Sequence, residues 1–286
     1  MAACTAALRG ITKQYKDFTL GPVDMTVPAG SIVGLIGENG AGKTTLLKIL
    51  CGVNRADDGT VDLLGGSPAD AATRAKIGVV FEDAFFYGSF TAAQVARSLA
   101  GMYGARWNAD SFSAHLRRFG LDAGKKLKEY SRGMRLKLSL AAALAHDPEL
   151  LVLDEATAGL DPVVRGELLD LFLEFIQDER HSIVMSSHIT ADLEQIADSI
   201  AYLHNGQLLF QENKDDLLQE YGVLHCGEDV LTSLPAGLVV FTRRGAYGCE
   251  SLVRERRTVQ ELLPEAVCDA ARLDDIMRFY SGRDAQ

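Results

Sequence analysis

The chain has 286 residues, of which 47% are hydrophobic, and this supplies enough apolar side chains for one large domain or two smaller ones. Lys and Arg number 29 against 39 Asp and Glu, and the formal net charge of −10 disfavours nucleic acid as the main partner, because it repels a phosphate backbone. The cysteines are scattered without a CxxC pair and no apolar run approaches the roughly 20 residues that span a bilayer, so neither a disulfide framework, nor a zinc site, nor a transmembrane segment is predicted.

The first 30 residues have the pattern of short strands. Apolar residues cluster near Ala6 to Ile11, and those of FTLGPVDMTVPAG are spaced for a half-buried hairpin. Tyr15 lies between these stretches. Taken alone it is an ordinary strand aromatic, but it precedes the glycine-rich loop described next, so we predict that its ring stacks on an adenine.

The segment GENGAGKTT follows the apolar run Ser31 to Ile36 and precedes LLKIL, which indicates a strand, a glycine-rich loop and a helix. This context predicts a phosphate cradle, in which backbone N–H groups turn inward around the phosphates of a nucleotide. Lys43 would reach the β- and γ-phosphates, Thr44 would place its hydroxyl on Mg²⁺, and Thr45 would donate toward the α-phosphate. The predicted nucleotide-binding residues of the loop are Gly37, Glu38, Asn39, Gly40, Ala41, Gly42, Lys43, Thr44 and Thr45.

A region of strands and then helices follows the loop. Turn-rich sequence surrounds a predicted strand at Thr60 to Leu64, and RAKIGVVFED predicts another that ends at Glu82. From Ala84 to about Glu129 the pattern becomes helical, with Val95, Leu99 and Met102 on one face. These residues predict a helical subdomain inserted into a sheet domain.

Three aromatic residues, Phe85, Phe86 and Tyr87, stand together at the entry to the helical region. Two interpretations are open for them. They either pack in the core or form an exposed docking surface for a partner helix.

The residues from Ser131 to Glu155 predict a helix and then a buried strand. Ser131 is a good N-cap, and the run Leu150 to Leu153 is typical of a parallel strand that delivers Asp154 and Glu155 to its carboxyl end. We predict that Asp154 holds Mg²⁺, through a water molecule, and that Glu155 polarises the water that attacks the γ-phosphorus. A surface acidic pair is the alternative.

A long amphipathic helix is predicted from Val163 to Arg180, followed by the strand SIVMSS. His188 comes just after that strand, at the same carboxyl edge, so we predict that it reaches a γ-phosphate oxygen. The segment DSIAYLHNGQLLFQEN predicts a hairpin with NG as its turn. The tail from Val223 onward predicts a strand, a possible hairpin and a helix in a small appended α/β unit.

Five motifs now stand in order along the chain: GENGAGKTT, YSRGM, LLVLDEAT, AGLD and SSHIT. Together they resemble the phosphate loop, signature, acidic strand, D-loop and switch histidine of an ABC transporter ATP-binding subunit, most of all those of bacterial ABC-2 type exporters. The resemblance covers roughly residues 5 to 215. It implies an α/β fold of the ABC type of P-loop NTPase, with a mainly parallel sheet core, an antiparallel β subdomain, an inserted helical subdomain and a small C-terminal α/β extension. The implied domains are 1–220, with the helical subdomain at about 84–146, and 221–286.

In this family two such domains meet head to tail around two nucleotides. The resemblance therefore implies that Ser131 and Gly133 contact the nucleotide of the opposite subunit and that Asp161 lies at the dimer seam. Glu82 stands where the family usually has a glutamine that touches Mg²⁺, which makes it a candidate metal ligand. The signature is usually a leucine, a serine, two glycines and a glutamine; here Arg132 adds a cation near the phosphates, and Met134 removes an amide.

The implied function is that of an ATP-binding and ATP-hydrolysing subunit that powers a membrane-embedded exporter. ATP and Mg²⁺ are the implied cofactors, and Glu155, His188, Lys43 and Glu82 the catalytic residues. The implied partners are a transmembrane permease and a second ATP-binding subunit, identical or related, which would place the chain on the cytoplasmic face of the membrane. Two alternatives remain: a soluble ABC-type ATPase acting on ribosomes or nucleic acid, which the single phosphate loop and the acidic balance disfavour, and a nucleotide sensor, which would need neither Glu155 nor His188.

Overall fold

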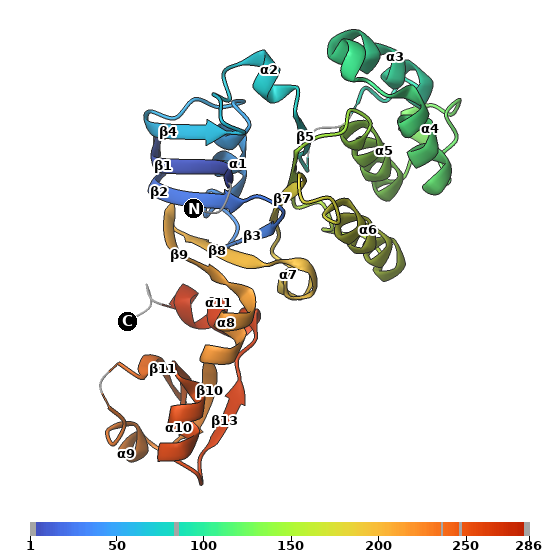
Figure 1. Ribbon diagram of the computed structural model, residues 1–286. Helices are drawn as coiled ribbons and strands as arrows, with labels where there is room; N and C mark the ends of the chain where they lie inside the picture. Colours follow the sequence, from blue (N-terminus) through green and yellow to red (C-terminus); the bar gives the residue numbers. More distant parts are fainter. Residues whose placement is uncertain (1–3, 83–85, 236, 246–247, 283–286) are drawn as a thin grey trace.

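The computed structural model describes residues 4–82, 86–235, 237–245 and 248–282. Within these ranges the chain forms a six-stranded sheet, a three-stranded sheet and, near the C-terminus, a four-stranded sheet (Figure 1). The strands are β1 (Cys4–Gln14), β2 (Thr19–Pro28), β3 (Ile32–Ile36), β4 (Asp58–Leu63), β5 (Ile77–Val80), β6 (Leu150–Asp154), β7 (Ser182–Ser186), β8 (Ser199–His204), β9 (Gln207–Asn213), β10 (Gly222–Cys226), β11 (Val239–Gly245), β12 (Gly248–Val253) and β13 (Val267–Ala270). The helices are α1 (Lys43–Leu50), α2 (Ala71–Arg74), α3 (Ala92–Tyr103), α4 (Ala109–Arg118), α5 (Arg132–Leu144), α6 (Pro162–Phe175), α7 (Thr190–Ile196), α8 (Lys214–Glu220), α9 (Glu228–Leu231), α10 (Arg256–Leu262) and α11 (Leu273–Ser281), with 3-10 turns η1 (Gly104–Arg106) and η2 (Leu127–Glu129). None of the helices in these ranges has the length and apolar character that crossing a membrane requires.

The six-stranded sheet has the order β5-β6-β7-β3-β8-β9, and only the pair β8 and β9 is antiparallel. Strands β3, β6 and β7 are buried along their whole length, because both faces of the sheet are covered, which explains their nearly continuous apolar sequences. Parallel strands end at the same edge of a sheet. The segments that follow β3, β6 and β7 therefore meet, and this edge carries the candidate site.

The three-stranded sheet covers one face of the central sheet. Strand β1 lies between β2 and β4 and is antiparallel to both, and side chains alternate between buried and exposed along most of β2. The buried side chains, such as Leu8 and Met25, pack with those of α1 against β3 and β7. The segment FTLGPVDMTVPAG, expected as a half-buried hairpin, forms one strand, β2, which pairs with β1 in an antiparallel hairpin. The strand expected at Thr60 to Leu64 is β4. Strand β5 ends at Val80, before the expected Glu82.

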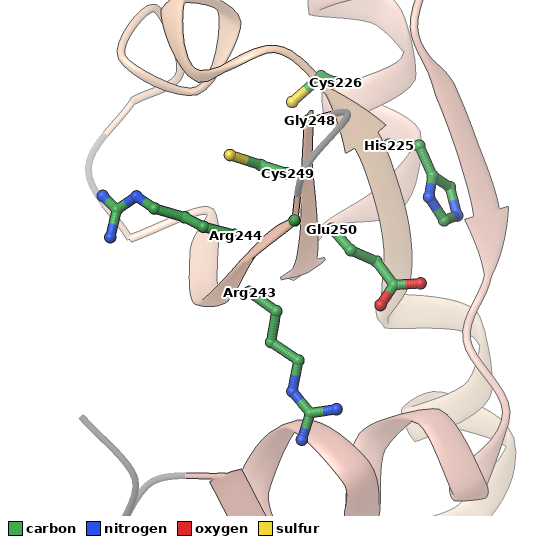
Figure 2. Close-up of a pocket in the computed structure, with 8 residues that line it drawn as sticks. His225, Cys226, Arg243, Arg244, Gly248, Cys249 and Glu250 are labelled. Atoms are coloured by element: carbon green, nitrogen blue, oxygen red, sulfur yellow. The ribbon is translucent and has the colours of Figure 1, made fainter.

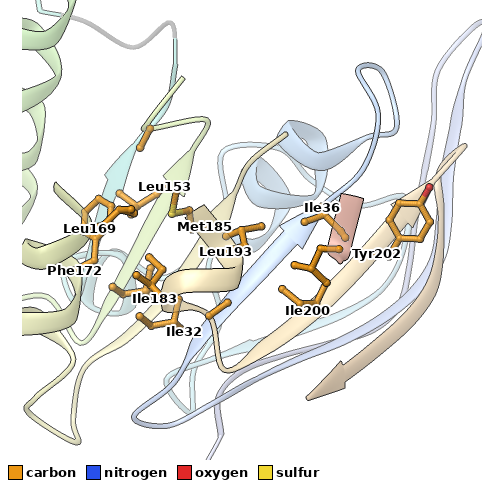
Figure 3. Packing of buried hydrophobic residues seen from close by; sticks show 14 of the residues in the cluster. Ile32, Ile36, Leu153, Leu169, Phe172, Ile183, Met185, Leu193, Ile200 and Tyr202 are labelled. Carbon is orange, nitrogen blue, oxygen red and sulfur yellow. The ribbon is translucent and has the colours of Figure 1, made fainter. Parts of the chain in front are cut away.

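The other face of the central sheet is covered by α6 and α7. Leu169 and Phe172 of α6 pack against Leu153, Ile183 and Met185 of the sheet (Figure 3). Each such side chain contributes about 1.5–3 kcal/mol when it is fully buried. This packing fixes the position of the loop that joins β6 to α6.

Helix α6 is shorter than predicted, because it ends at Phe175 and not at Arg180. In the turn that follows, the Asp178 carboxylate accepts a hydrogen bond from the backbone N–H of Arg180 and so favours a turn over another helical turn. The apolar pattern that predicted the longer helix takes no account of this hydrogen bond.

Helices α3, α4 and α5 form a layer beside the sheet (Figure 1), and α5 also packs against the main core through Leu136 and Leu140. They enclose a core of their own that includes Val95, Phe112 and Leu138. As predicted, Ser131 caps α5, and its Oγ accepts a hydrogen bond from the N–H of Met134. Met102 of the predicted α3 face is 79% exposed, because periodicity sets the direction of a side chain whereas burial also needs a covering neighbour.

The C-terminal sheet has the order β11-β12-β10-β13 and packs with α10 around Leu224, Val253 and Val259. The hairpin of β11 and β12 and the helix α11 agree with the predicted elements, whereas β10, β13 and α10 had not been expected. Helix α11 returns toward the central sheet (Figure 1), where Ile276 and Phe279 join the main core.

Candidate active site

The loop between β3 and α1 contains two glycines whose backbone angles and close neighbours disfavour a side chain. Gly42 has φ of 106°, and a Cβ at this position would lie 2.9 Å from side-chain atoms of Phe18 and Leu20. A Cβ on Gly37 would lie 2.2 Å from the carbonyl oxygen of Leu203. The loop therefore presents bare backbone at the start of α1, where unpaired N–H groups favour an anion.

The other predicted residues of this loop divide between its tip and its base. Glu38, Asn39 and Gly40 are exposed, Ala41 is buried, and Thr45 is half-buried in α1. The exposed tip leaves room for a ligand.

Lys43 is the first residue of α1, and its side chain is only 6% exposed. Its Nζ donates hydrogen bonds to the carbonyl oxygens of Gly37 (2.7 Å) and Glu38 (3.3 Å) and lies 3.3 Å from Oε1 of Glu155. A buried ammonium needs such partners. A phosphate in the loop would compete with them for the same cation.

Glu155 lies between two predicted catalytic residues. Its Oε1 faces Lys43, and its Oε2 lies 2.6 Å from Nδ1 of His188 and accepts a weaker hydrogen bond from the His188 backbone N–H (3.3 Å). The Glu155 side chain is 11% exposed and that of His188 is 53% exposed. The carboxylate is thus held at both oxygens at the rim of the loop.

Asp154 is buried, and both of its oxygens accept hydrogen bonds. Oδ2 accepts from Oγ1 of Thr44 (2.8 Å) and Oδ1 from Oγ of Ser186 (2.7 Å). A hydroxyl and a carboxylate oxygen are hard ligands that suit Mg²⁺, which takes its remaining ligands from waters and phosphates. Among the described residues no group of three or more His, Cys, Asp or Glu could hold a metal. The Thr44 hydroxyl and the Asp154 carboxylate nevertheless supply oxygen ligands of the kind that suits Mg²⁺.

Ser186 is a site residue that was not predicted. Besides its bond to Asp154, its Oγ accepts a hydrogen bond from the backbone N–H of Glu155 (3.0 Å). A polar residue at the end of the apolar strand SIVMSS was the available signal. The role of Ser186 could be inferred from this signal only with the knowledge that β6 and β7 are neighbours.

Glu82 forms an ion pair with the signature. Its Oε1 accepts a hydrogen bond from Nη2 of Arg132 (2.9 Å), with the two side chains 45% and 52% exposed. The Arg132 guanidinium also covers Gly159, where a Cβ would lie 3.4 Å from Nη1. Glu82, the signature and the AGLD motif therefore meet within one subunit.

Comparison with known proteins decides the family. A family model described as "ABC transporter" matches residues 20–158. The bacitracin transport ATP-binding protein BcrA of Enterococcus faecalis is 36% identical over 212 residues, which cover 72% of this chain and 68% of BcrA. The chain belongs to the ABC transporter ATP-binding subunits. This membership confirms the predicted family and its ATP-binding function.

Two further relatives of this ABC subunit are similar. The lantibiotic transport ATP-binding protein SrtF of Streptococcus pyogenes is 33% identical over 211 residues, which cover 73% of this chain and 90% of SrtF. An uncharacterized ABC transporter ATP-binding protein of Synechocystis is 38% identical over 206 residues, or 70% of this chain. The aligned part spans only 58% of the Synechocystis protein, less than two thirds of its length.

Solved structures share the fold of the ABC subunit. An ATP-binding subunit of an ABC transporter superposes with a TM-score of 0.68 at 29% identity, over 74% of this chain and 91% of that one. CbiO1 of Clostridium perfringens, described as part of the transporter complex cbiONQ, gives 0.62 at 25% identity over 75% and 90%. The cassette MJ0796, a dimer with ADP and Pi, gives 0.66 at 23% identity over 73% and 98%. The predicted fold class is confirmed.

The residues predicted to act across a dimer lie at helix starts. Ser131 is the N-cap of α5, and Asp161 caps α6, where its Oδ1 accepts a hydrogen bond from the N–H of Val164 (3.1 Å). Gly133 has space, because a Cβ there would lie 3.5 Å from Leu160. Ser131 and Asp161 therefore have local roles as helix caps beside the ones predicted for the dimer.

Tyr15 is 45% exposed and lies just after β1. Its ring lies 6.4 Å from that of Phe18, which in turn covers Gly42 of the phosphate loop, and its hydroxyl accepts a long hydrogen bond from Nδ2 of Asn54 (3.4 Å). The exposed Tyr15 ring is therefore accessible to an adenine, and the predicted stacking contact stays a prediction.

The three residues predicted for docking differ from one another. Phe85 lies outside the described residues. Phe86 is half-buried against the helical layer, whereas Tyr87 is 77% exposed with its ring 5.7 Å from that of Phe90. Phe86 also lines a cavity of about 380 Å³ between the sheet domain and the helical layer, together with Cys51, Val53, Arg74, Ile77, Val79, Phe81, Leu99, Tyr103, Ser139, Ala142 and Ala143.

Proposed function

We propose that this ABC subunit hydrolyses Mg-ATP and, as one of two such subunits, drives a membrane-embedded exporter. The observation that carries the proposal is the position of Glu155, whose carboxylate lies between Lys43 and His188 beside the phosphate loop. A carboxylate in this place can accept a proton from water at the point where phosphates would lie.

The contacts of Glu155 suggest how nucleotide binding would prepare it for catalysis. ATP carries more negative charge than a carboxylate and would draw Lys43 away from Oε1. That oxygen would then be free to orient the attacking water, while His188 continues to hold Oε2. Lys43 and the loop N–H groups would stabilise the charge on the transferred phosphoryl oxygens.

Thr44 and Asp154 would hold the magnesium ion. When it is bound, Mg²⁺ neutralises charge on the β- and γ-phosphate oxygens. Ser186 keeps Asp154 oriented through its other oxygen, and this fixes the direction in which Oδ2 points. Glu82 would join this set only after it leaves Arg132.

The direct test is the substitution Glu155→Gln. We expect ATP affinity to change by less than about threefold and turnover to fall by about 10²–10⁴-fold, because an amide cannot accept the proton. The ATP-bound variant should accumulate as a dimer in size-exclusion chromatography with light scattering. Glu149→Gln, the same change at the opposite end of β6, is the control and should keep its turnover. Undiminished turnover in Glu155→Gln would remove Glu155 from the mechanism.

The dimer would place Ser131 and Gly133 of one subunit against the nucleotide of the other. Two features support this: α5 begins at the signature with its N-terminal dipole, and Gly133 has no side chain to block an approaching phosphate. Adding Gly133→Asp to Glu155→Gln should keep the ATP-loaded subunit monomeric, because the new carboxylate would meet a phosphate. Dimers formed as readily as without it would contradict this arrangement.

A permease helix is the proposed occupant of the cavity beside Phe86. The cavity has apolar walls from both the sheet domain and the helical layer, and the relatives BcrA and SrtF are named as transport proteins. A helix docked there would move with both layers and would hold the subunit at the cytoplasmic face of the membrane.

The docking proposal is tested with Val53→Asp, because Val53 lines the cavity and is 62% exposed, so that the change leaves folding intact. The matched control is Val267→Asp, at a position 58% exposed in the C-terminal sheet. Each is used as bait on detergent-solubilised native membranes. The wild type and the control should recover a polytopic membrane protein that Val53→Asp loses by at least about tenfold, a loss of about 1.4 kcal/mol of affinity or more. Recovery of ribosomes or nucleic acid by the wild type would reject the exporter.

A further inference from the structure

Three residues of the C-terminal sheet stand in a row across its strands. Cys249 of β12 lies directly opposite Cys226 of β10 on one side and Arg244 of β11 on the other. Directly opposite residues of an antiparallel sheet project to the same face. Figure 2 shows both thiols on the side toward which Arg244 extends and His225 on the other side. Both cysteines are free thiols.

The register brings the two cysteines within bonding reach. Opposite residues in an antiparallel pair have Cα atoms about 4.5 or 5.5 Å apart, and disulfides join Cα atoms about 4.4–6.8 Å apart. The strands approach closely at this end, since a Cβ on Gly248 would lie 3.0 Å from the carbonyl oxygen of Cys226.

The third cysteine of this sheet is less well placed. Cys268 of β13 stands opposite Leu224, two residues before Cys226. A diagonal pair of this kind is about 7–8 Å apart, beyond the usual span of a disulfide. The fold therefore selects one pair out of three possible ones.

Access and charge at the pair are compatible with slow oxidation. Cys249 is 7% exposed and Cys226 is half-buried, and both line a cavity of about 610 Å³ that would admit a small oxidant. Burial, and then the charge of the nearby Cys249, raise the pKa of Cys226 above its usual value. The thiol is therefore protonated at neutral pH, and its reaction should become faster as the pH rises, because the thiolate is the reacting form.

We propose that Cys226 and Cys249 form a dithiol site that a peroxide converts into an intrasubunit disulfide. One thiolate attacks the peroxide and takes one oxygen as a sulfenic acid, and the hydroxide that leaves takes up the proton that this thiol released, which gives water. The other thiolate then attacks that sulfur and displaces a second hydroxide, which takes up the proton of the second thiol and leaves as the second water. In total the two thiols lose two electrons and two protons, and hydrogen peroxide is reduced to two waters. The bond joins β10 to β12 and encloses residues 227–248, which include α9 and β11. This site is independent of the ATPase proposal.

The experiment uses the full-length reduced protein, treated with hydrogen peroxide at pH 7 and at pH 8.5. Remaining thiols are blocked with N-ethylmaleimide, and peptides are mapped without reduction by mass spectrometry. We expect one linked peptide pair, Cys226 with Cys249, that is 2 Da lighter than the two free peptides, forms several-fold faster at the higher pH and disappears with a reductant. Cys249→Ser should abolish it, and Cys268→Ser should keep it.

A parallel reaction in 8 M urea shows whether the fold selects the pair. Without the fold, the five cysteines of the chain should give a mixture of pairs that includes Cys268. The proposal is overturned if the native protein gives that same mixture, links between molecules, or only sulfinic acid at Cys226 with Cys249 still free.

Discussion

Glu155 has a backbone conformation that few residues adopt, with φ of 51°, in the left-handed region. Such a conformation costs about 1–3 kcal/mol and persists only where neighbours hold it. Here Oγ of Ser186 accepts a hydrogen bond from the backbone N–H of Glu155, and Lys43 and His188 hold the Glu155 carboxylate. This backbone conformation directs the Glu155 side chain away from the line of β6 and toward the phosphate loop.

The ion pair between Glu82 and Arg132 leads to a prediction about magnesium. If Glu82 is a ligand of Mg²⁺ in the closed dimer, Arg132 competes with the metal for the Glu82 carboxylate. An exposed ion pair of this kind contributes about 0–1 kcal/mol. Arg132→Gly should therefore lower the Mg²⁺ concentration for half-maximal ATPase activity by about two- to fivefold. Glu82→Gln should raise it, because an amide is a weaker ligand than a carboxylate.

The double variant decides whether the two residues act on one another. In the Glu82→Gln background, Arg132→Gly should no longer shift the Mg²⁺ requirement, because the carboxylate for which it competed is gone. Arg118→Ala, which breaks the exposed pair with Glu174 elsewhere in the subunit, should leave the requirement unchanged. Equal shifts from Arg132→Gly in both backgrounds would separate Arg132 from the metal.

At the scale of elements, the loop between β6 and α6 is tied to α7 by a buried carboxylate. Asp192 of α7 is 1% exposed and accepts hydrogen bonds from Oγ1 of Thr157 (2.6 Å) and from Nε of Arg165 in α6. The loop carries Glu155, and α7 follows His188 directly. This contact therefore fixes the two segments that carry the proposed catalytic residues relative to each other.

Thr157→Val removes the hydroxyl with little change in volume and leaves Asp192 paired with Arg165. We expect kcat to fall about three- to tenfold with little change in KM for ATP, because positioning is lost and phosphate binding is kept. Thr5→Val is the matched control: Thr5 is also buried, and its hydroxyl hydrogen-bonds that of Ser182 (2.8 Å), far along the sheet from the site. The control should lose stability but keep kcat. The same loss of kcat in both variants would make the effect one of stability alone.

The sequence predicted which residues lie at the site better than it predicted their contacts. Lys43, Asp154 and Glu155 were recognisable because residue type and local context are enough for a phosphate loop and an acidic strand end. Ser186 and Asp192 were missed, because their roles depend on which strands and helices are neighbours. Short strands such as β10 and β13 were missed for a related reason, since a few apolar residues show no clear period.

At the scale of the whole molecule, the C-terminal helix binds the extension to the ATPase core. The Tyr280 ring of α11 meets those of Tyr202, Phe210 and Phe241 edge-on, with centroids 4.9–5.8 Å apart. The backbone N–H of Leu273 donates to Oε1 of Glu194 in α7 (2.8 Å). The proposed boundary between 1–220 and 221–286 therefore runs through a shared core, and this has a measurable consequence for unfolding.

Phe279→Ala tests whether the two parts unfold together. Phe279 is 2% exposed in the main core, and such a truncation costs about 3–5 kcal/mol. Because α11 packs on the central sheet, we expect calorimetry to give one transition, lowered by roughly 6–12 °C, rather than two. Leu262→Ala, at a position 49% exposed in α10, should shift it by no more than about 2 °C. A separate early transition, with the main one unmoved, would instead make residues 221–286 an independent domain that α11 only touches.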